Sequence, residues 1–378
     1  MEAVQGELSK YVVDFAPNGS TQAQIPFMTT AESLGSRDVI AEGTLESSGA
    51  FHVEESSLES GVVRRLIFAA NTNVIQTEVR LVAKSNQPAK KNKGGGGKKT
   101  SGKKKGNKGK GGNSAAGDGD YLAMVPDPTY LCFDYHRAML AALSLLPAAS
   151  LKDSTGVIVG LGGGALPMAM QSFAPTMALT CLELDAEVVK VASKFFGFRE
   201  DSKVSVAVAD GLAYDYGTNT HGLICLDVDS KDVSLGISCP PPAFLEASFL
   251  SKVKSALLED GILVVNLSAR SSELLKGALD AIKGAFSNGR VFTIMPSEDD
   301  VNLIVIAVNG MSVALPKVQA TASVAEAQKK RAGDTSSLSG VLRSRVREWL
   351  LEVPDMRTDP MGLMELAEAL KEITANLV

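Results

Sequence analysis

The sequence predicts an α/β protein built on a seven-stranded sheet whose last strand is antiparallel. Seven short apolar runs, most of them separated by segments of helical periodicity, are typical of a sheet covered by helices on both faces. The runs are VIVGL, ALTCLEL, KVSVAVAD, GLICLDVD, GILVVNLS, RVFTIMP and NLIVIAVN, between residues 157 and 309. About five residues separate the last two runs. Because that is too short for a helical crossover, we expect this pair to be antiparallel.

Around this sheet the sequence divides into five segments. Residues 1–49 are expected to be a partly disordered linker, and 50–83 hold β-branched runs between polar turns, which predicts a small β-hairpin unit. Residues 84–119 have almost nothing apolar to bury and are predicted to be a disordered Lys/Gly-rich insert. The seven-stranded sheet occupies the domain 120–310. In 311–378 apolar residues recur at helical spacing, which predicts a helical tail.

Charge is unevenly distributed along the chain. The net charge is −5, but Lys84–Lys110 holds eleven lysines and no acid, which leaves the remainder at −16. A string of lysines can be a solvated linker, or it can contact RNA or the ribosome, because it binds phosphate without needing a fold. The acidic remainder favours basic substrates by electrostatic steering.

Several functional classes find little support in the composition. The four cysteines form no CxxC pair and the three histidines have no paired spacing, so we expect no metal site and free thiols in a reducing compartment. No apolar run approaches the roughly 18 residues that cross a bilayer. We therefore expect a cytoplasmic protein without a membrane partner.

A glycine-rich turn follows the first strand of the sheet and opens a helix. The segment GLGGGA at 160–165 satisfies the GxGxxG/A pattern, in which the backbone comes close to a nucleotide ligand. We expect Gly160, Gly162 and Gly164 to bind a cofactor. The same turn would serve NAD, and a purely structural turn is a further alternative.

Carboxylates at the ends of the next two strands narrow the choice of cofactor. Glu183 ends the second strand, where it can accept the ribose hydroxyls, and Asp210 with Gly211 follows the third strand, near an adenine amine. Acids at successive strand ends argue for an adenosyl ligand. Five parallel strands with a hairpin ending are typical of the Rossmann-like class I methyltransferase fold, so we expect S-adenosyl-L-methionine.

Three further acids follow the fourth strand, at the edge where open α/β sheets bind ligands. They are Asp227, Asp229 and Asp232. Methyl transfer is an in-line displacement, so the enzyme must hold an unprotonated nucleophile against the methyl donor. We expect Asp229 and Asp232 to serve a reacting amine and Asp227 to border the cofactor. A loop of solvent-facing acids is the alternative.

These motifs together resemble the elongation factor 1-alpha lysine and N-terminal methyltransferases, the methyltransferase-like protein 13 family, in the spermidine-synthase-like branch. The matching segments are NVIQTE, YLC with HRAM, VGLGGGALP, LELD, FFGF, ADGL and DVDSKD with SCPPPAF. They cover roughly residues 7–310. The resemblance implies that Asp229 is the catalytic carboxylate and that Gln76, Tyr135 and His136 border the cofactor.

The family's proteins have two methyltransferase halves, and this chain resembles the linker and the C-terminal half. The resemblance implies methylation of the α-amine at the N-terminus of elongation factor 1-alpha. An α-amine has a pKa of about 7.7 to 8.0, against about 10.4 for lysine, so a useful fraction is neutral near pH 7. Such a reaction needs no strong base.

Two other functions remain open at this point. Relatives that make polyamines carry an Asp where this chain has Gly163, and their DSTDPxGPA pattern becomes DSKDVSLGI here, which weighs against a polyamine aminopropyltransferase. A catalytically silent RNA- or ribosome-associated binding module is the other alternative. Homodimer formation and the number of methyl groups transferred stay open as well.

Overall fold

A computed structural model describes the central part of the chain and a short C-terminal strand. The described residues are 37–46, 48–58, 60–69, 75–83, 124–146, 154–230, 233–296, 301–310 and 374–377. The predicted Lys/Gly-rich insert, most of the predicted linker and nearly all of the predicted helical tail lie outside these ranges. Within them, no helix is both long and apolar enough to span a membrane.

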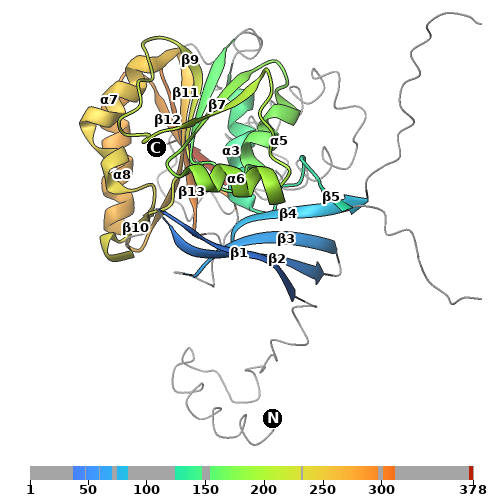
Figure 1. Ribbon diagram of the computed structural model, residues 1–378. Helices are drawn as coiled ribbons and strands as arrows, with labels where there is room; N and C mark the ends of the chain where they lie inside the picture. The colour runs from blue at the N-terminus through green and yellow to red at the C-terminus, as the bar shows by residue number, and fades with distance from the viewer. Residues whose placement is uncertain are drawn as a thin grey trace, which may run out of the picture.

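The N-terminal part is a five-stranded antiparallel sheet, here called sheet A (Figure 1). Its strands follow chain order: β1 (Arg37–Leu45), β2 (Gly49–Leu58), β3 (Gly61–Phe68), β4 (Ile75–Ala83) and β5 (Met124–Pro126). The sheet extends beyond the predicted hairpin unit at both ends. The edge strand β1 is largely exposed and β5 has three residues, so neither carries the apolar alternation that predicts a strand.

The second sheet, sheet B, is the one the apolar runs predict. Its strands are β6 (Thr155–Val159), β7 (Ala178–Glu183), β8 (Val204–Val208), β9 (His221–Leu226), β11 (Leu257–Ala269), β12 (Arg290–Met295) and β13 (Leu303–Val308). They are ordered β12-β13-β11-β9-β6-β7-β8, with β13 antiparallel to both of its neighbours. The class I methyltransferase fold with an antiparallel last strand is therefore confirmed.

Two short strands extend sheet B. β10 (Ile237–Cys239) pairs with the end of β11, and β14 (Thr374–Leu377) pairs antiparallel with β12. The residues of β14 fall within the segment for which the sequence predicts helices. At these four residues the helical prediction is wrong, because the backbone pairs with the open edge of β12.

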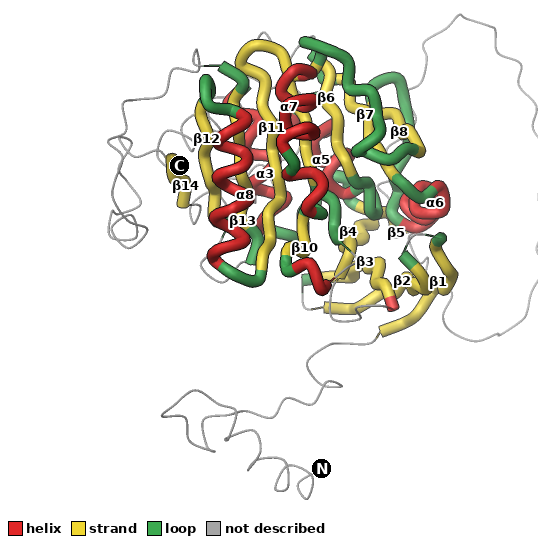
Figure 2. Tube along the Cα trace, turned by 90° about the vertical axis from the view of Figure 1, so that its left-hand side faces the viewer, coloured by secondary structure: helices red, strands yellow, loops and turns green. Residues whose placement is uncertain are grey.

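Helices cover both faces of sheet B (Figure 2). On one face lie α3 (Asp134–Ala141), the 3-10 turn η3 (Ala142–Leu145), α5 (Ala165–Phe173) and α6 (Ala186–Phe195). On the other lie η5 (Pro242–Leu245), α7 (Ala247–Ala256) and α8 (Ser272–Ala285), while η4 (Val233–Leu235) lies in the loop after β9. Each face has its own apolar core, one around Ile158, Met139 and Met170, the other around Leu263 and Leu250.

A third apolar cluster fastens sheet A to this domain. Leu66 and Val79 of sheet A pack with Val188 and Phe196 from α6 and the residue that follows it. The guanidinium of Arg64 adds a polar link, because its Nη1 donates a hydrogen bond to the carbonyl oxygen of residue 195 at 2.5 Å. Sheet A is thereby held next to the glycine-rich turn that starts α5.

This docking can be tested at Leu66, which is fully buried in the third cluster. Leu66→Ala should lower the free energy of unfolding by about 2–5 kcal/mol, because it leaves a cavity between sheet A and α6. Val39→Ala, on the exposed edge strand β1, should cost less than about 0.5 kcal/mol. Urea denaturation measures both. Equal losses for the two variants would show that sheet A does not share a core with the domain.

Candidate functional site

The glycine-rich turn lies at the carboxyl edge of sheet B, where β6 passes into α5. Gly160 has φ +98°, and a Cβ there would lie 2.2 Å from the carbonyl oxygen of Asp227. Only glycine can therefore bring the turn this close to the end of β9. Two backbone hydrogen bonds, Gly160 N to Leu182 O and Asp227 N to Val159 O, both 2.9 Å, tie the ends of β6, β7 and β9 together.

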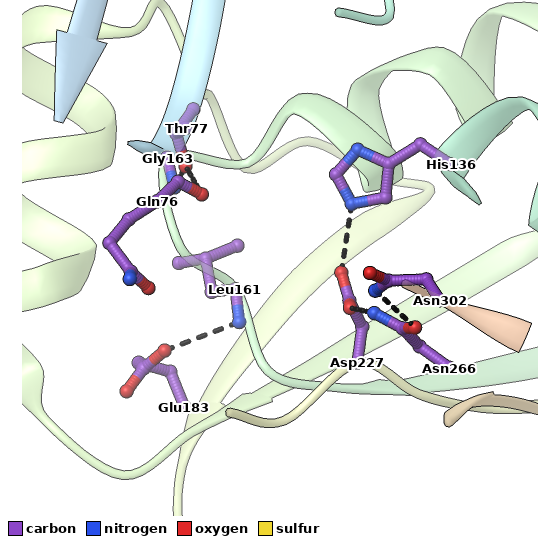
Figure 3. A network of polar contacts seen from close by, with 9 residues as sticks. All are labelled: Gln76, Thr77, His136, Leu161, Gly163, Glu183, Asp227, Asn266 and Asn302. Atoms are coloured by element: carbon purple, nitrogen blue, oxygen red, sulfur yellow. Dashed lines mark hydrogen bonds and ion pairs between the residues drawn. The ribbon is translucent and has the colours of Figure 1, made fainter. Parts of the chain in front are cut away.

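Sheet A contributes to the same turn. The amide of Gly163 donates a hydrogen bond to Thr77 Oγ1 at 2.8 Å, and the Thr77 hydroxyl donates to the carbonyl oxygen of Gln76 at 2.8 Å. A Cβ on Gly163 would lie 2.4 Å from Thr77 Cγ2, so the side chain of β4 fills the space beside this glycine. Figure 3 shows the Gln76 amide and the Glu183 carboxylate extending toward the same space beside Leu161.

Glu183, at the end of β7, is held by the backbone on both sides. Its Oε2 accepts a hydrogen bond from Leu161 N at 3.2 Å and its Oε1 accepts one from Asp185 N at 3.0 Å. Burial raises the pKa of Glu183, and these amides offset only part of that rise. Each oxygen keeps a second lone pair, which suits a pair of ribose hydroxyls. The neighbouring Asp185 is structural, because its buried carboxylate caps α6 by accepting from Glu187 N.

Asp210 lies beside Glu183 at the same edge, because Ala209 N donates to Glu183 O at 2.9 Å. Its side chain is exposed, and its Oδ1 accepts a hydrogen bond from Leu212 N at 2.9 Å. Gly211 is buried, and its carbonyl oxygen accepts from the Tyr216 hydroxyl at 2.9 Å. Hydrogen bonds thus hold the turn, while the side chain of Asp210 is exposed to solvent.

A chain of polar contacts surrounds Asp227, the residue after β9 (Figure 3). His136 Nε2, from α3, lies 2.9 Å from Asp227 Oδ2. The Asn266 amide, from β11, donates to Asp227 Oδ1 at 3.0 Å. Behind it, the Asn302 amide donates to Asn266 Oδ1 at 2.7 Å. His136 and Asn266 thus contact one carboxylate directly, and Asn302 contacts it through Asn266, although the three residues are distant in the sequence.

These partners keep Asp227 ionised although it is largely buried. Burial alone would raise its pKa, but the adjacent His136 ring and the Asn266 amide outweigh burial, so the pKa of Asp227 is below its usual value. Since Asp227 carries the charge, the hydrogen bond from His136 has Nε2 as its donor. At the nearby Tyr135 the pKa shift has the opposite direction: burial, and then the charge of Asp227, raise the pKa of the Tyr135 hydroxyl.

The other predicted acids differ from Asp227 in their surroundings. Asp229 is exposed, two residues further along the loop. Asp232 lies outside the described residues, so its placement is untested.

Two residues of this site, Asn266 and Asn302, were not predicted from the sequence. A polar residue inside the apolar run GILVVNLS was the available signal for Asn266, whereas Asn302 precedes a strand, where a polar residue is common.

The arrangement as a whole fits an adenosyl cofactor. The turn at 160–164, Glu183 and Asp210 line one edge of sheet B, with Gln76 entering from sheet A and Asp227 at the end of the central strand β9. The turn leads into the N-terminus of α5, and the helix dipole there favours negatively charged groups. In the part of the chain that the structure describes, no group of three or more His, Cys, Asp or Glu is placed to hold a metal ion.

No family model matches the chain. The chain is 34% identical, over 91% of its length, to the eEF1A lysine and N-terminal methyltransferase of Mus musculus, of which the match covers 50%. To the Danio rerio protein of the same name it is 39% identical over 76% of its length, covering 41% of that protein. The chain thus spans about half the length of the curated relatives it matches.

A solved structure provides a comparison of the fold alone. A probable spermidine synthase from Corynebacterium glutamicum superposes with a TM-score of 0.50 at 15% identity, over 83% of this chain and 88% of that one. At this identity the likeness concerns the arrangement of strands and helices and carries no information about the reaction.

The ionised state of Asp227 predicts a pH-dependent stability. His136→Phe keeps a ring but removes the donor to Asp227, so it should lower the free energy of unfolding at pH 7 by about 1–3 kcal/mol. The lowered pKa of Asp227 contributes stability that is complete above the unfolded-state value of about 3.8 and is lost as the pH falls through the folded-state value. The deficit should therefore shrink as the pH falls below about 3.8 in chemical denaturation. A deficit that is constant with pH would assign the effect to ring packing.

Proposed function

We propose, from the premise that this chain belongs to the family of the eEF1A lysine and N-terminal methyltransferases, that it transfers a methyl group from S-adenosylmethionine to a protein amine. The observation that carries the proposal is the placement of an ionised, largely buried carboxylate, Asp227, beside a glycine-rich turn. The turn and its flanking acids suit the cofactor. The carboxylate suits an amine that becomes positively charged during the reaction.

The cofactor would be held by the carboxyl edge of sheet B. Glu183 would accept the ribose hydroxyls, Asp210 the exocyclic amine of adenine, and the backbone at Gly160, Gly162 and Gly164 would approach the ligand without side-chain hindrance. Gln76 would close the site from sheet A. S-adenosylmethionine, when bound, supplies the activated methyl group, and these residues supply its position.

The sequence indicates Asp229 as the acid that serves the reacting amine, but because Asp229 is exposed and Asp227 is held by two side chains, we propose that the amine lies over Asp227 instead. Its carboxylate is fixed by His136 and Asn266 before any substrate arrives, so little reorganisation is needed as positive charge develops on the nitrogen. Asp229 is exposed at the rim, where solvent screens its charge, and we propose that it guides the incoming amine. A contribution of Asp232 stays a prediction.

We propose that the substrate is the N-terminal α-amine of elongation factor 1-alpha. The lowered pKa of Asp227 makes this carboxylate a weak base. It could not readily take the proton of a lysine ammonium, with a pKa of about 10.4, whereas an α-amine with a pKa of about 7.7 to 8.0 is partly neutral already. The proposed site therefore favours the α-amine over a lysine side chain.

Aminopropyl transfer to a polyamine is the less favoured enzymatic alternative. The enzymes that resemble this chain and make polyamines carry an Asp where Gly163 stands. Here Thr77 fills that space, since a Cβ on Gly163 would lie 2.4 Å from its methyl carbon. An RNA or ribosome contact through Lys84–Lys110, a homodimer and a cytoplasmic location stay separate predictions, because nothing in the described residues bears on them.

The cofactor assignment predicts a specific loss of affinity. Glu183→Ala should abolish measurable S-adenosylmethionine binding in calorimetry, because two hydrogen bonds to a charged acceptor, each of about 1.5–3 kcal/mol, would be lost. Glu187→Ala, on the exposed surface of α6, is the matched control and should bind normally. Unchanged affinity of Glu183→Ala would remove this residue from the site.

The transfer step is tested with a peptide beginning Gly-Lys, the N-terminus expected of elongation factor 1-alpha after removal of its methionine. Labelled methyl transfer is the readout. Asp227→Asn should keep S-adenosylmethionine binding but lose about 10²- to 10³-fold in rate, because asparagine cannot offset the charge that develops on the nitrogen. Asp229→Asn should lose less, since its charge is screened. If Asp229→Asn loses more than Asp227→Asn, the exposed acid is the catalytic residue.

Blocking groups on the same peptide identify the amine. Acetylating the α-amine should stop the reaction, whereas acetylating the lysine side chain should leave it nearly unchanged. Methylation of the α-acetylated peptide would identify a lysine as the substrate instead. If neither peptide nor intact elongation factor 1-alpha accepts a methyl group, the proposed function itself fails.

A further inference from the structure

The polar chain around Asp227 continues to Asn302, which the proposed function above does not use. Asn302 lies one step behind Asn266, and its amide donates to Asn266 Oδ1 at 2.7 Å. It precedes β13, the antiparallel strand of sheet B, whose Leu303 pairs with Leu267 of β11. Because β13 is antiparallel, its first residues lie at the carboxyl edge. The antiparallel last strand therefore brings Asn302 beside the site.

The contact with Asn302 determines which way the Asn266 amide faces. An asparagine side chain has a donating nitrogen and an accepting oxygen of nearly equal size, so the two orientations differ only in their partners. With its oxygen taken by the Asn302 donor, Asn266 directs its nitrogen at Asp227. In the reverse orientation the Asn266 oxygen would face the carboxylate, and two acceptors would meet in a largely buried place.

We propose that Asn302 is a positioning residue: by donating to Asn266, it holds the Asn266 amide in the orientation that supports the charged Asp227. The inference rests on the proposed function, in which Asp227 orients the reacting amine. It adds a residue that acts through two others. Each side chain in this series donates to the next, Asn302 to Asn266 and Asn266 to Asp227. His136 donates to Asp227 from the other side.

Two substitutions at Asn302 separate orientation from space filling. Asn302→Asp has nearly the same shape, but an ionised carboxylate only accepts, so the Asn266 amide would turn its nitrogen toward residue 302 and its oxygen toward Asp227. Asn302→Ala removes the donor and leaves both orientations available. A positioning role predicts that the aspartate variant is the more damaged, whereas a space-filling role predicts the reverse.

The first measurement is steady-state methyl transfer to the Gly-Lys peptide. We expect kcat to fall about 10²-fold for Asn302→Asp and only about 2- to 10-fold for Asn302→Ala, while KM for the peptide and the affinity for S-adenosylmethionine stay within about twofold of wild type. Asn288→Asp is the control for an added negative charge, since Asn288 is exposed and its side-chain oxygen accepts from Lys254. It should behave as wild type. An alanine variant as slow as the aspartate variant, or slower, would overturn the inference.

A second measurement needs no activity. Asp227→Asn supplies an amide nitrogen that can donate to a reversed Asn266 oxygen, so it should restore stability to the Asn302→Asp variant in urea denaturation. The double variant should be more stable than the sum of the two single changes predicts. Simple additivity would show that the Asn266 amide does not turn. If this coupling is present but wild type transfers no methyl group, the proposed function fails and the positioning of Asn266 stands.

Discussion

A charged carboxylate in a largely buried position is the constraint on which the rest of the site depends. Asp227 stays ionised because α3 supplies the His136 ring and β11 supplies the Asn266 amide. Leaving such a charge without partners would cost several kcal/mol, so the helix and strands must meet at this point. The same residue determines the shape of the turn, because its backbone carbonyl allows only glycine at position 160. Asp227 thus shapes the site in two ways, through the charge of its side chain and through its backbone carbonyl.

Sheet A completes the site on the other side of the turn. The Thr77 hydroxyl accepts the Gly163 amide, and its methyl group occupies the space that a side chain at 163 would need. The apolar cluster around Leu66 and Phe196 keeps this contact in place. The packing of sheet A against α6 therefore also maintains the geometry of the glycine-rich turn. Without sheet A, the proposed cofactor site would lack one wall.

The sequence predicted the seven main strands of sheet B and several residues of the candidate site. Some features are visible within a few consecutive residues, so the sequence alone indicates them. They are the uniformly apolar strands, Glu183 at the end of a strand and the glycine-rich turn. Asn266 and Asn302 matter only because β11 and β13 pair, and Asp227 differs from Asp229 only through partners from α3 and β11. Those are contacts between distant segments. The edge strand β1 was missed for the same reason, since its neighbour β2 and not its own composition makes it a strand.

The ionisation of Asp227 links the fold, the proposed chemistry and the role of the two asparagines. It can be measured directly by NMR titration of the folded protein with ¹³C-labelled aspartate carboxyls, in which the Asp227 signal is assigned by its loss in Asp227→Asn. If His136 and Asn266 outweigh burial, this carboxylate titrates below 3.8, the value of a free aspartate side chain. A pKa at or above that value would mean that burial prevails over His136 and Asn266. The site would then lack the fixed negative charge that the proposed reaction needs.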